Sequence, residues 1–225
     1  MTETERGGVP AQIHLEPVAA PSILGLYGLA AATFAVAAHE AGWFGGPNSL
    51  YYLVPFAAML GGLAQFVAGM WAYKARDGVA TAVHGIWGAF WLAYAVLAAL
   101  VAAKLIPAPQ NQVPELGFWF GILAAITWVT TAAAAAENQA LSWVLGILSL
   151  GSTCMAIAFF AGSHAWLMLA SYILMLSAIA AWYAASALML DTAYGRQVWP
   201  VGKPSMPELP GFAMGLGEPG VIRGQ

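Results

Sequence analysis

The sequence predicts an all-α integral membrane protein with six transmembrane helices. Only 8% of its 225 residues are charged and 61% are hydrophobic, whereas about a quarter of the residues in a soluble domain are charged. The hydrophobic residues gather in six runs, each long enough to cross a bilayer, which takes about 20 residues of helix. No run alternates polar and apolar residues as the strands of a membrane barrel do. We therefore expect lipid to surround most of the chain.

Each predicted helix is bounded by a short polar or turn-forming segment. In chain order these segments read GGPN, KARDG, KLIPAPQNQVPE, ENQ and GSH. The helices between them are expected at residues 22–45, 49–73, 79–103, 116–136, 140–161 and 165–190. Residues 21–194 thus form the transmembrane domain. Residues 1–20 are a polar N-terminal tail without a signal-peptide pattern, and residues 195–225 are a Gly/Pro-rich tail that we expect to be extended or poorly ordered.

The basic residues indicate how the helices cross the membrane. With both tails on one side, six of the seven Lys and Arg residues fall on that side, and only Lys104 falls on the other. Segments rich in Lys and Arg face the cytoplasm. The six residues are Arg6, Lys74, Arg76, Arg196, Lys203 and Arg223. We therefore expect a multi-pass protein of the plasma (inner) membrane whose two termini are cytoplasmic.

The first and fourth predicted helices begin alike. Residues 21–33 read PSILGLYGLAAAT and residues 114–127 read PELGFWFGILAAIT. A repeat of three helices reverses its direction across the membrane, so a true repeat would give an inverted 3+3 architecture. Glycine and alanine strings are also common in unrelated membrane helices, and the sequence leaves both interpretations open.

Several classes of function are disfavoured by what the chain contains. The net charge of −3 resides mainly in tails and loops, which argues against nucleic-acid binding. The single Cys154 cannot form a disulfide within the chain. The four histidines have no metal-ligand spacing, and His39 and His84 fall at different depths, which argues against a haem between them. Since no catalytic constellation is visible, we expect no cofactor, no metal and no enzymatic activity.

Polar residues inside the spans are the candidates for a solute path. Gln65 lies in GGLAQFVAGMWAYK, and His84 shares one helix face with Trp87, Gly88 and Trp91. For Gln65 and His84, an interhelical hydrogen bond and a place along a path are both open. No span carries Lys, Arg or Asp in its middle, and Glu40 falls near the outer end of the first span. Because ion-coupled transporters usually expose such a residue at depth, we expect a neutral or proton-accompanied solute.

Four segments in order resemble the acetate uptake transporter, or succinate–acetate permease, family. They are APSILGLYGL (20–29), GGLAQFVAGMWAYK (61–74), WGAFW (87–91) and GRQVWPVG (195–202). Two positions depart from the first family motif, because Ala20 replaces its Asn and Ile23 its second Pro. The chain therefore looks like a divergent member of that family.

The resemblance implies a homo-hexamer in which each six-helix subunit holds its own path. It places the narrowest point of that path at Leu29, Trp87 and Leu148, on the first, third and fifth helices. These residues lie seven to eight positions into helices of one direction, so each is about 10–12 Å deep at 1.5 Å per residue. Other residues are expected along the path or at its mouth, namely Gly25, Leu26, Gly28, Gln65, His84 and Trp91. We further expect Gly25, Gly28, Gly117 and Gly121 to let the first and fourth helices approach each other.

The resemblance favours a transporter or channel-like permease in the lipid bilayer for small monocarboxylates, acetate first and succinate second. We expect the carboxylate to move with a proton. A channel for a neutral solute such as urea or ammonia is an alternative, as is a membrane subunit of a larger complex that conducts nothing.

Overall fold

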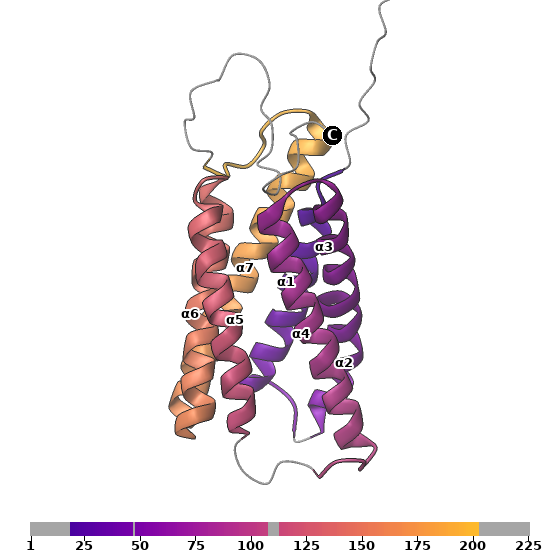
Figure 1. The fold of residues 1–225 in the computed structure, drawn as a ribbon, viewed down its shortest axis with the longest axis vertical. Coiled ribbons are helices and arrows are strands. Elements are labelled where there is room, and N and C mark those ends of the chain that lie inside the picture. Colours follow the sequence, from indigo (N-terminus) through magenta and orange to yellow (C-terminus); the bar gives the residue numbers. More distant parts are fainter. Residues whose placement is uncertain (1–18, 47, 108–112, 203–225) are drawn as a thin grey trace, which may run out of the picture.

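The computed structural model describes residues 19–46, 48–107 and 113–202, and these form a bundle of long helices (Figure 1). Within these described residues, six helical spans are long and apolar enough to cross a membrane, which confirms the predicted number. In chain order the helices are α1 (Pro21–Glu40), α2 (Ser49–Ala57), the π-helix η1 (Ala58–Ala64), α3 (Gln65–Lys74), α4 (Gly78–Ala102), α5 (Pro114–Ala134), α6 (Gln139–Ala161) and α7 (His164–Tyr194). The second span is the continuous run of α2, η1 and α3.

The helix ends follow from side chains that the sequence places there. Asp77 and Asn138 begin α4 and α6, since their carboxyl and amide oxygens accept from the backbone N–H groups of Ala80 and Leu141, both at 2.8 Å. At the other end of α6, Gly162 adopts a positive φ of 68° that closes the helix. The first helix ends at Glu40, five residues before the predicted end, and the segment after it is turn and bend.

The π-helix in the middle of the second span was not predicted. Pro55 lies just before it in α2 and has no N–H to donate. The wider turns of η1 bring two glycines against neighbouring helices. A Cβ atom placed on Gly61 would lie 2.5 Å from the Ala32 side chain and 2.8 Å from Trp91, and one placed on Gly62 would lie 2.8 Å from Leu92. Glycine is therefore needed here for close approach.

The six spans form a ring in sequence order (Figure 1). Helices α5, α6 and α7 pack consecutively, α7 packs along α1, and α1 packs against η1 and α3. Helix α4 packs against η1 and α3 and then contacts α5, which closes the ring. The buried apolar core lies inside it, with residues from α1, α4, α5, α6 and α7.

The expected approach of the first and fourth helices is wrong. Within the described residues, α1 and α5 have no direct packing contact, because a ring of six in sequence order sets its first and fourth members opposite each other. Gly25 instead faces the His84 ring of α4, and Gly28 faces the Leu60 carbonyl of η1. Gly117 of α5 meets Phe160 of α6, whereas a Cβ atom placed on Gly121 would have no neighbouring atom within 4 Å.

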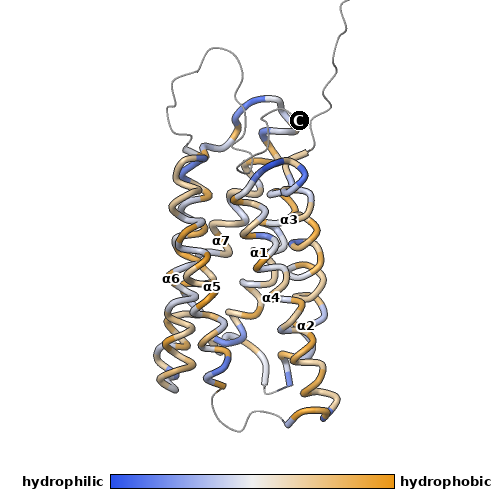
Figure 2. Tube along the Cα trace, viewed as in Figure 1, coloured by the Kyte–Doolittle hydropathy of each residue, from blue (hydrophilic) through white to orange (hydrophobic). Residues whose placement is uncertain are grey.

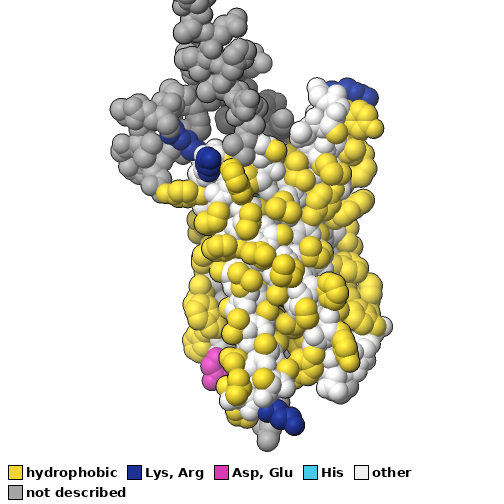
Figure 3. All heavy atoms as spheres, turned by 90° about the vertical axis from the view of Figure 1, so that its right-hand side faces the viewer, with side chains coloured by type: hydrophobic (Ala, Val, Ile, Leu, Met, Phe, Trp, Pro, Cys, Tyr) yellow, Lys and Arg dark blue, Asp and Glu magenta, His cyan; other side chains and the backbone are white. Residues whose placement is uncertain are grey.

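The outer surface of the bundle is apolar, as a lipid-facing surface must be. Figure 2 shows hydrophobic residues along the helices and hydrophilic ones mainly toward the ends, and in Figure 3 hydrophobic side chains cover the visible flank. Large side chains are turned outward, including Tyr52, Phe56, Val129 and Trp143, each more than two-thirds exposed. A soluble protein would not expose so many. The chain is therefore a multi-pass membrane protein.

Residues 195–202, which follow α7, form a turn and bends and are anchored to the bundle. The backbone N–H groups of Gln139 and Ala140 donate to the carbonyls of Gly202 and Val201, both at 2.9 Å. These N–H groups belong to the first turn of α6 and would otherwise lack a helical partner. The Tyr183 hydroxyl donates to the Pro200 carbonyl at 2.8 Å, and its ring stacks on Trp199. The GRQVWPVG motif thus joins α7 to α6, and the rest of the predicted tail, residues 203–225, lies outside the described residues.

The contacts of the glycines lead to a stability prediction. Gly28→Ala forces a methyl group against the backbone carbonyl of Leu60, so we expect it to lower the free energy of unfolding by about 1–3 kcal/mol. Gly121→Ala is the matched control, because that position has free space in α5 and alanine favours helix over glycine by about 0.5–1 kcal/mol. Thermal unfolding in detergent measures both. Equal melting temperatures for the two variants would contradict the assigned α1–η1 contact.

Candidate functional site

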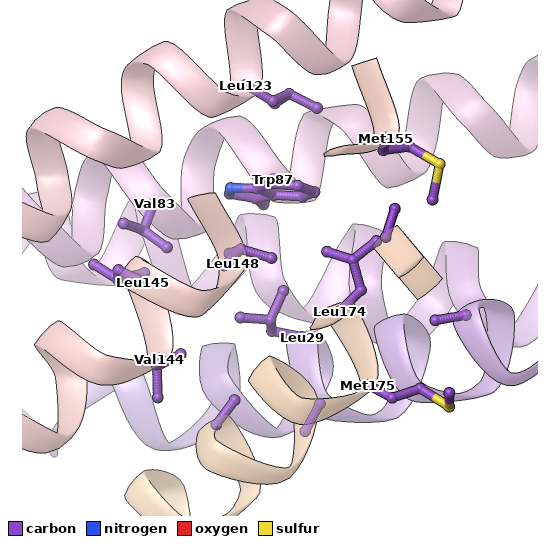
Figure 4. Packing of buried hydrophobic residues seen from close by; sticks show 14 of the residues in the cluster. Leu29, Val83, Trp87, Leu123, Val144, Leu145, Leu148, Met155, Leu174 and Met175 are labelled. Carbon is purple, nitrogen blue, oxygen red and sulfur yellow. The ribbon is translucent and has the colours of Figure 1, made fainter. Parts of the chain in front are cut away.

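Leu29, Trp87 and Leu148 come together inside the ring of helices. They belong to α1, α4 and α6, and their exposed fractions are 0%, 3% and 0%. Figure 4 shows their side chains beside one another, with Val83, Leu145 and Leu174 around them. We call these three residues the central cluster. The sequence places them at a similar depth on three helices, and the structure places them in one buried group.

Trp87 is held in the central cluster by a hydrogen bond. Its indole Nε1 donates to the Thr127 hydroxyl of α5 at 3.1 Å, and that hydroxyl donates to the Leu123 carbonyl at 2.6 Å. Phe90 meets the Trp87 ring edge to face, with the ring centroids 5.6 Å apart. Sequence reasoning missed Thr127, although a threonine in the middle of a span is a group that needs a partner. The bond fixes the orientation of the largest ring in the cluster.

The remaining predicted path residues lie on α1, α3 and α4 and are buried. Leu26 is 1% exposed, and Gly25 and Gly28 are buried beside it on α1. Gln65 is 0% exposed and His84 is 1% exposed. A Cβ atom on Gly25 would lie 2.5 Å from the His84 ring, so this glycine makes room for the imidazole.

Gln65 and His84 lack the hydrogen bonds that a purely structural role would give them. Among the described residues, the amide nitrogen and oxygen of Gln65 have no hydrogen-bond partner in the protein, and the Nδ1 atom of His84 has none either. An unsatisfied buried polar group costs about 1–3 kcal/mol. Such groups are ordinarily satisfied by ordered water or a ligand where protein atoms do not do so. The interhelical hydrogen bond considered for these two side chains is therefore absent between described protein groups.

A cavity of about 210 Å³ adjoins the central cluster. Trp87 forms part of its wall, and the cavity extends from there toward the end of the bundle where α1 ends at Glu40. We call it the inner cavity. Its polar lining residues are Thr33, Glu40, Trp91 and Tyr94, and its apolar lining residues are Val36, Ala37, Phe90, Leu116, Phe120, Met155, Phe159, Leu167 and Leu174.

Of the inner cavity, sequence reasoning found only Trp87 and Trp91. It placed Glu40 near the outer end of its span and attached no function to it. A signal was present, since Thr33 and Glu40 follow Leu29 at four and eleven residues and so share its helix face. The pairing of that face with Tyr94 depends on which helices are neighbours, which the sequence does not show.

Two larger hollows lie between helices at the outer surface. One, of about 450 Å³, lies between α1, η1 and α7 and includes the exposed side chains of Leu24, Leu60 and Trp182. The other, of about 440 Å³, lies between α4 and α5 and includes exposed Ile86, Trp119 and Ile122. Their linings are almost entirely apolar, as expected of grooves that face lipid tails. Neither touches the central cluster residues Leu29, Trp87 or Leu148.

Comparison with known proteins agrees with the six-helix fold. The chain is 26% identical over 186 residues to the succinate-acetate/proton symporter SatP of Escherichia coli strain K12. The matched region covers 83% of this chain and 96% of that protein. The SatP of Shigella flexneri matches with the same identity and coverage. A solved structure described as that of the bacterial acetate channel SatP superimposes with a TM-score of 0.75 at 26% identity, covering 82% of this chain and 99% of that one.

The family comparison extends over nearly the whole chain. Residues 4–203 match the model of the GPR1/FUN34/yaaH family, and the matched range includes all six spans and residues 195–202, which join α7 to α6. The chain therefore belongs to the GPR1/FUN34/yaaH family of acetate uptake transporters and channels, and it is not an enzyme.

Proposed function

We propose that the protein is a permease for small carboxylates, with the monocarboxylate acetate as the first substrate and the dicarboxylate succinate as a second. The observation that carries the proposal is the central cluster, in which three side chains from three helices are buried together inside the ring of spans and one of them, Trp87, forms part of the wall of the inner cavity. The relatives named as an acetate symporter and an acetate channel support this choice of substrate. The solute would pass between Leu29, Trp87 and Leu148 within each subunit.

The apolar character of the central cluster bears on the form in which the substrate crosses. Moving an isolated carboxylate from water into a dry apolar region carries a large desolvation free energy. The central cluster has no charged group that would compensate for this free energy. The neutral acid has no such penalty for charge. We therefore propose that the substrate crosses the cluster with its proton, and that uptake is proton-coupled.

We also propose the orientation and assembly that the sequence favours. Lys74, Arg76 and Arg196 lie at one end of the bundle and Lys104 at the other, which supports cytoplasmic termini in the plasma (inner) membrane. Helices α1 and α5 both begin at a proline, which supports an inverted 3+3 repeat. The homo-hexamer follows from the family resemblance. Residues 21–194 would form its transmembrane domain.

A channel for a neutral solute such as urea or ammonia is the second candidate. It is favoured by the absence of any charged residue in the central cluster. Competition distinguishes the two, because unlabelled urea should leave acetate uptake unchanged if the path is built for monocarboxylates. A non-conducting subunit of a larger complex is a third candidate, and purification as a homo-oligomer that takes up acetate would exclude it.

The proposed crossing as a neutral acid predicts a dependence on pH. Uptake of labelled acetate into proteoliposomes should rise as the external pH falls from about 7 toward the pKa of a simple carboxylic acid, about 4 to 5. The reason is that the neutral fraction of the acid grows as the pH falls. Protein-free vesicles give the background of passive permeation. A rate above background that stays constant over this range would contradict the mechanism.

The central cluster predicts how selectivity changes with side-chain size. Leu29→Ala removes a fully buried side chain at the proposed constriction, so uptake of bulkier monocarboxylates such as butyrate should increase relative to acetate. The substitution should also cost about 2–5 kcal/mol of stability, so monodispersity in detergent must be checked. Leu150→Ala on the same bundle is the control, because Leu150 is 46% exposed on the outside of α6. If both variants keep the wild-type ratio of butyrate to acetate uptake, Leu29 does not line the constriction.

A further inference from the structure

The polar side chains of the inner cavity lie on the two helices that also carry Leu29 and Trp87. On α1, Thr33 and Glu40 follow Leu29 at four and eleven residues. On α4, Trp91 and Tyr94 follow Trp87 at four and seven residues. These spacings keep each set on one helix face, and eleven residues at 1.5 Å each carry α1 about 16 Å from the central cluster to Glu40. The cavity therefore continues the proposed path toward one end of the bundle.

Two buried groups at the near end of the inner cavity have no protein partner. Thr33 is 4% exposed and Trp91 is 5% exposed, and within the described chain neither the Thr33 hydroxyl nor the Trp91 Nε1 makes a hydrogen bond. Other buried hydroxyls behave differently, since those of Thr127 and Ser149 donate to carbonyls of their own helices. An indole N–H can only donate. Trp91 thus requires an acceptor, and both residues belong to the lining of the inner cavity.

Glu40 supplies an acid at the far end of the same cavity. It is partly buried, and among the described residues that line the cavity it is the only acidic one, with the Tyr94 hydroxyl from α4 as the other titratable group. Further titratable groups at this end lie outside the lining. They include His39 beside Glu40, Lys104 after α4, Glu115 at the start of α5, His164 at the start of α7 and the hydroxyls of Tyr51, Tyr52 and Tyr172.

We propose that the inner cavity binds the carboxyl group of a small monocarboxylate, which takes a proton from Glu40 at the far end of the cavity and then accepts hydrogen bonds from Thr33 and Trp91 at the near end. This inference rests on the proposed function and assigns residues to its coupling. The volume of about 210 Å³ corresponds to about seven water molecules at about 30 Å³ each. An acid of a few carbon atoms fits such a space, whereas a long-chain acid does not.

The proton step balances without any other reactant. The O–H bond of the protonated Glu40 carboxyl breaks, and an O–H bond forms on the substrate carboxylate, which becomes the neutral acid. Glu40 is left as a carboxylate and regains a proton from water at its own end of the bundle. The neutral acid then crosses the central cluster, where a carboxylate would be too costly. Glu40 thereby allows uptake at a pH at which little neutral acid exists in solution.

The test compares Glu40→Gln, Glu40→Asp and wild type in proteoliposomes, with acetate uptake measured near pH 5 and near pH 7. Without a proton donor, uptake by Glu40→Gln should follow the neutral fraction of acetic acid and fall roughly fifty- to a hundredfold over this range. Wild-type uptake should also fall over this range, but by less than about tenfold, and Glu40→Asp, which keeps a carboxyl group, should restore most of the rate near pH 7. Glu115→Gln is the matched control, because Glu115 is exposed at the same end and lies outside the cavity lining.

The outcomes separate this inference from the proposed function. If wild type takes up acetate and Glu40→Gln has the wild-type profile, the role of Glu40 is overturned and the permease stands. A uniform loss at both pH values without rescue by Glu40→Asp indicates a structural role and also overturns it. If wild type takes up no acetate above background at either pH, the proposed function fails, and the inference fails with it.

In a second measurement, Thr33→Val should raise the KM for acetate several-fold and leave the pH profile unchanged. An unchanged KM would contradict the role of Thr33 in the binding site.

Discussion

The interior of a bilayer offers no water to a polar group, and the structure is organised by that constraint. The backbone satisfies it by forming helices, and the hydroxyls of the second half of the chain satisfy it locally. Thr127, Ser149 and Ser152 donate to the carbonyls of Leu123, Leu145 and Leu148, each four residues earlier. The Ser177 hydroxyl reaches across from α7 to the Val144 carbonyl of α6. In α5, α6 and α7 the buried hydroxyls therefore have hydrogen-bond partners, and the Ser177 bond also links α7 to α6.

The first half of the chain does not complete its hydrogen bonds in this way. All the buried side-chain groups that lack a partner in the described part of the chain belong to α1, α3 and α4, namely Thr33, Gln65, His84 and Trp91. They lie on both sides of the central cluster along α1 and α4. A closed, static core would be destabilised by each of them, whereas a passage that admits water and a hydrogen-bonding solute would satisfy them in turn. This asymmetry is the physical reason to place the path along α1 and α4, with α5–α7 as its fixed support.

The sequence predicted well what depends on one helix at a time. Composition and run length set the six spans, and Asp77 and Asn138 cap helices close to where polar segments were expected. The family motifs, together with depth along three helices of one direction, led to Leu29, Trp87 and Leu148. Two features that depend on which helices are neighbours were predicted wrongly or not predicted. The glycines of α1 face α4 and η1 rather than α5, and the pairing of Glu40 with Tyr94 in one cavity requires the order of helices around the ring, which hydropathy does not contain.

The proposed permease requires the central cluster to lie on the route of the substrate, and reversible modification of one residue of the cluster tests this directly. Leu148→Cys in a Cys154→Ser background carries one cysteine in the chain, at the cluster. Methylthiolation of that cysteine, with completeness confirmed by mass, adds a small group to the constriction, and the Cys154→Ser parent is the control. If the substrate passes through the cluster, modification should stop acetate uptake, and a reducing agent, which removes the added group, should restore the uptake. Unchanged uptake by fully modified protein would show that the substrate does not pass between these side chains.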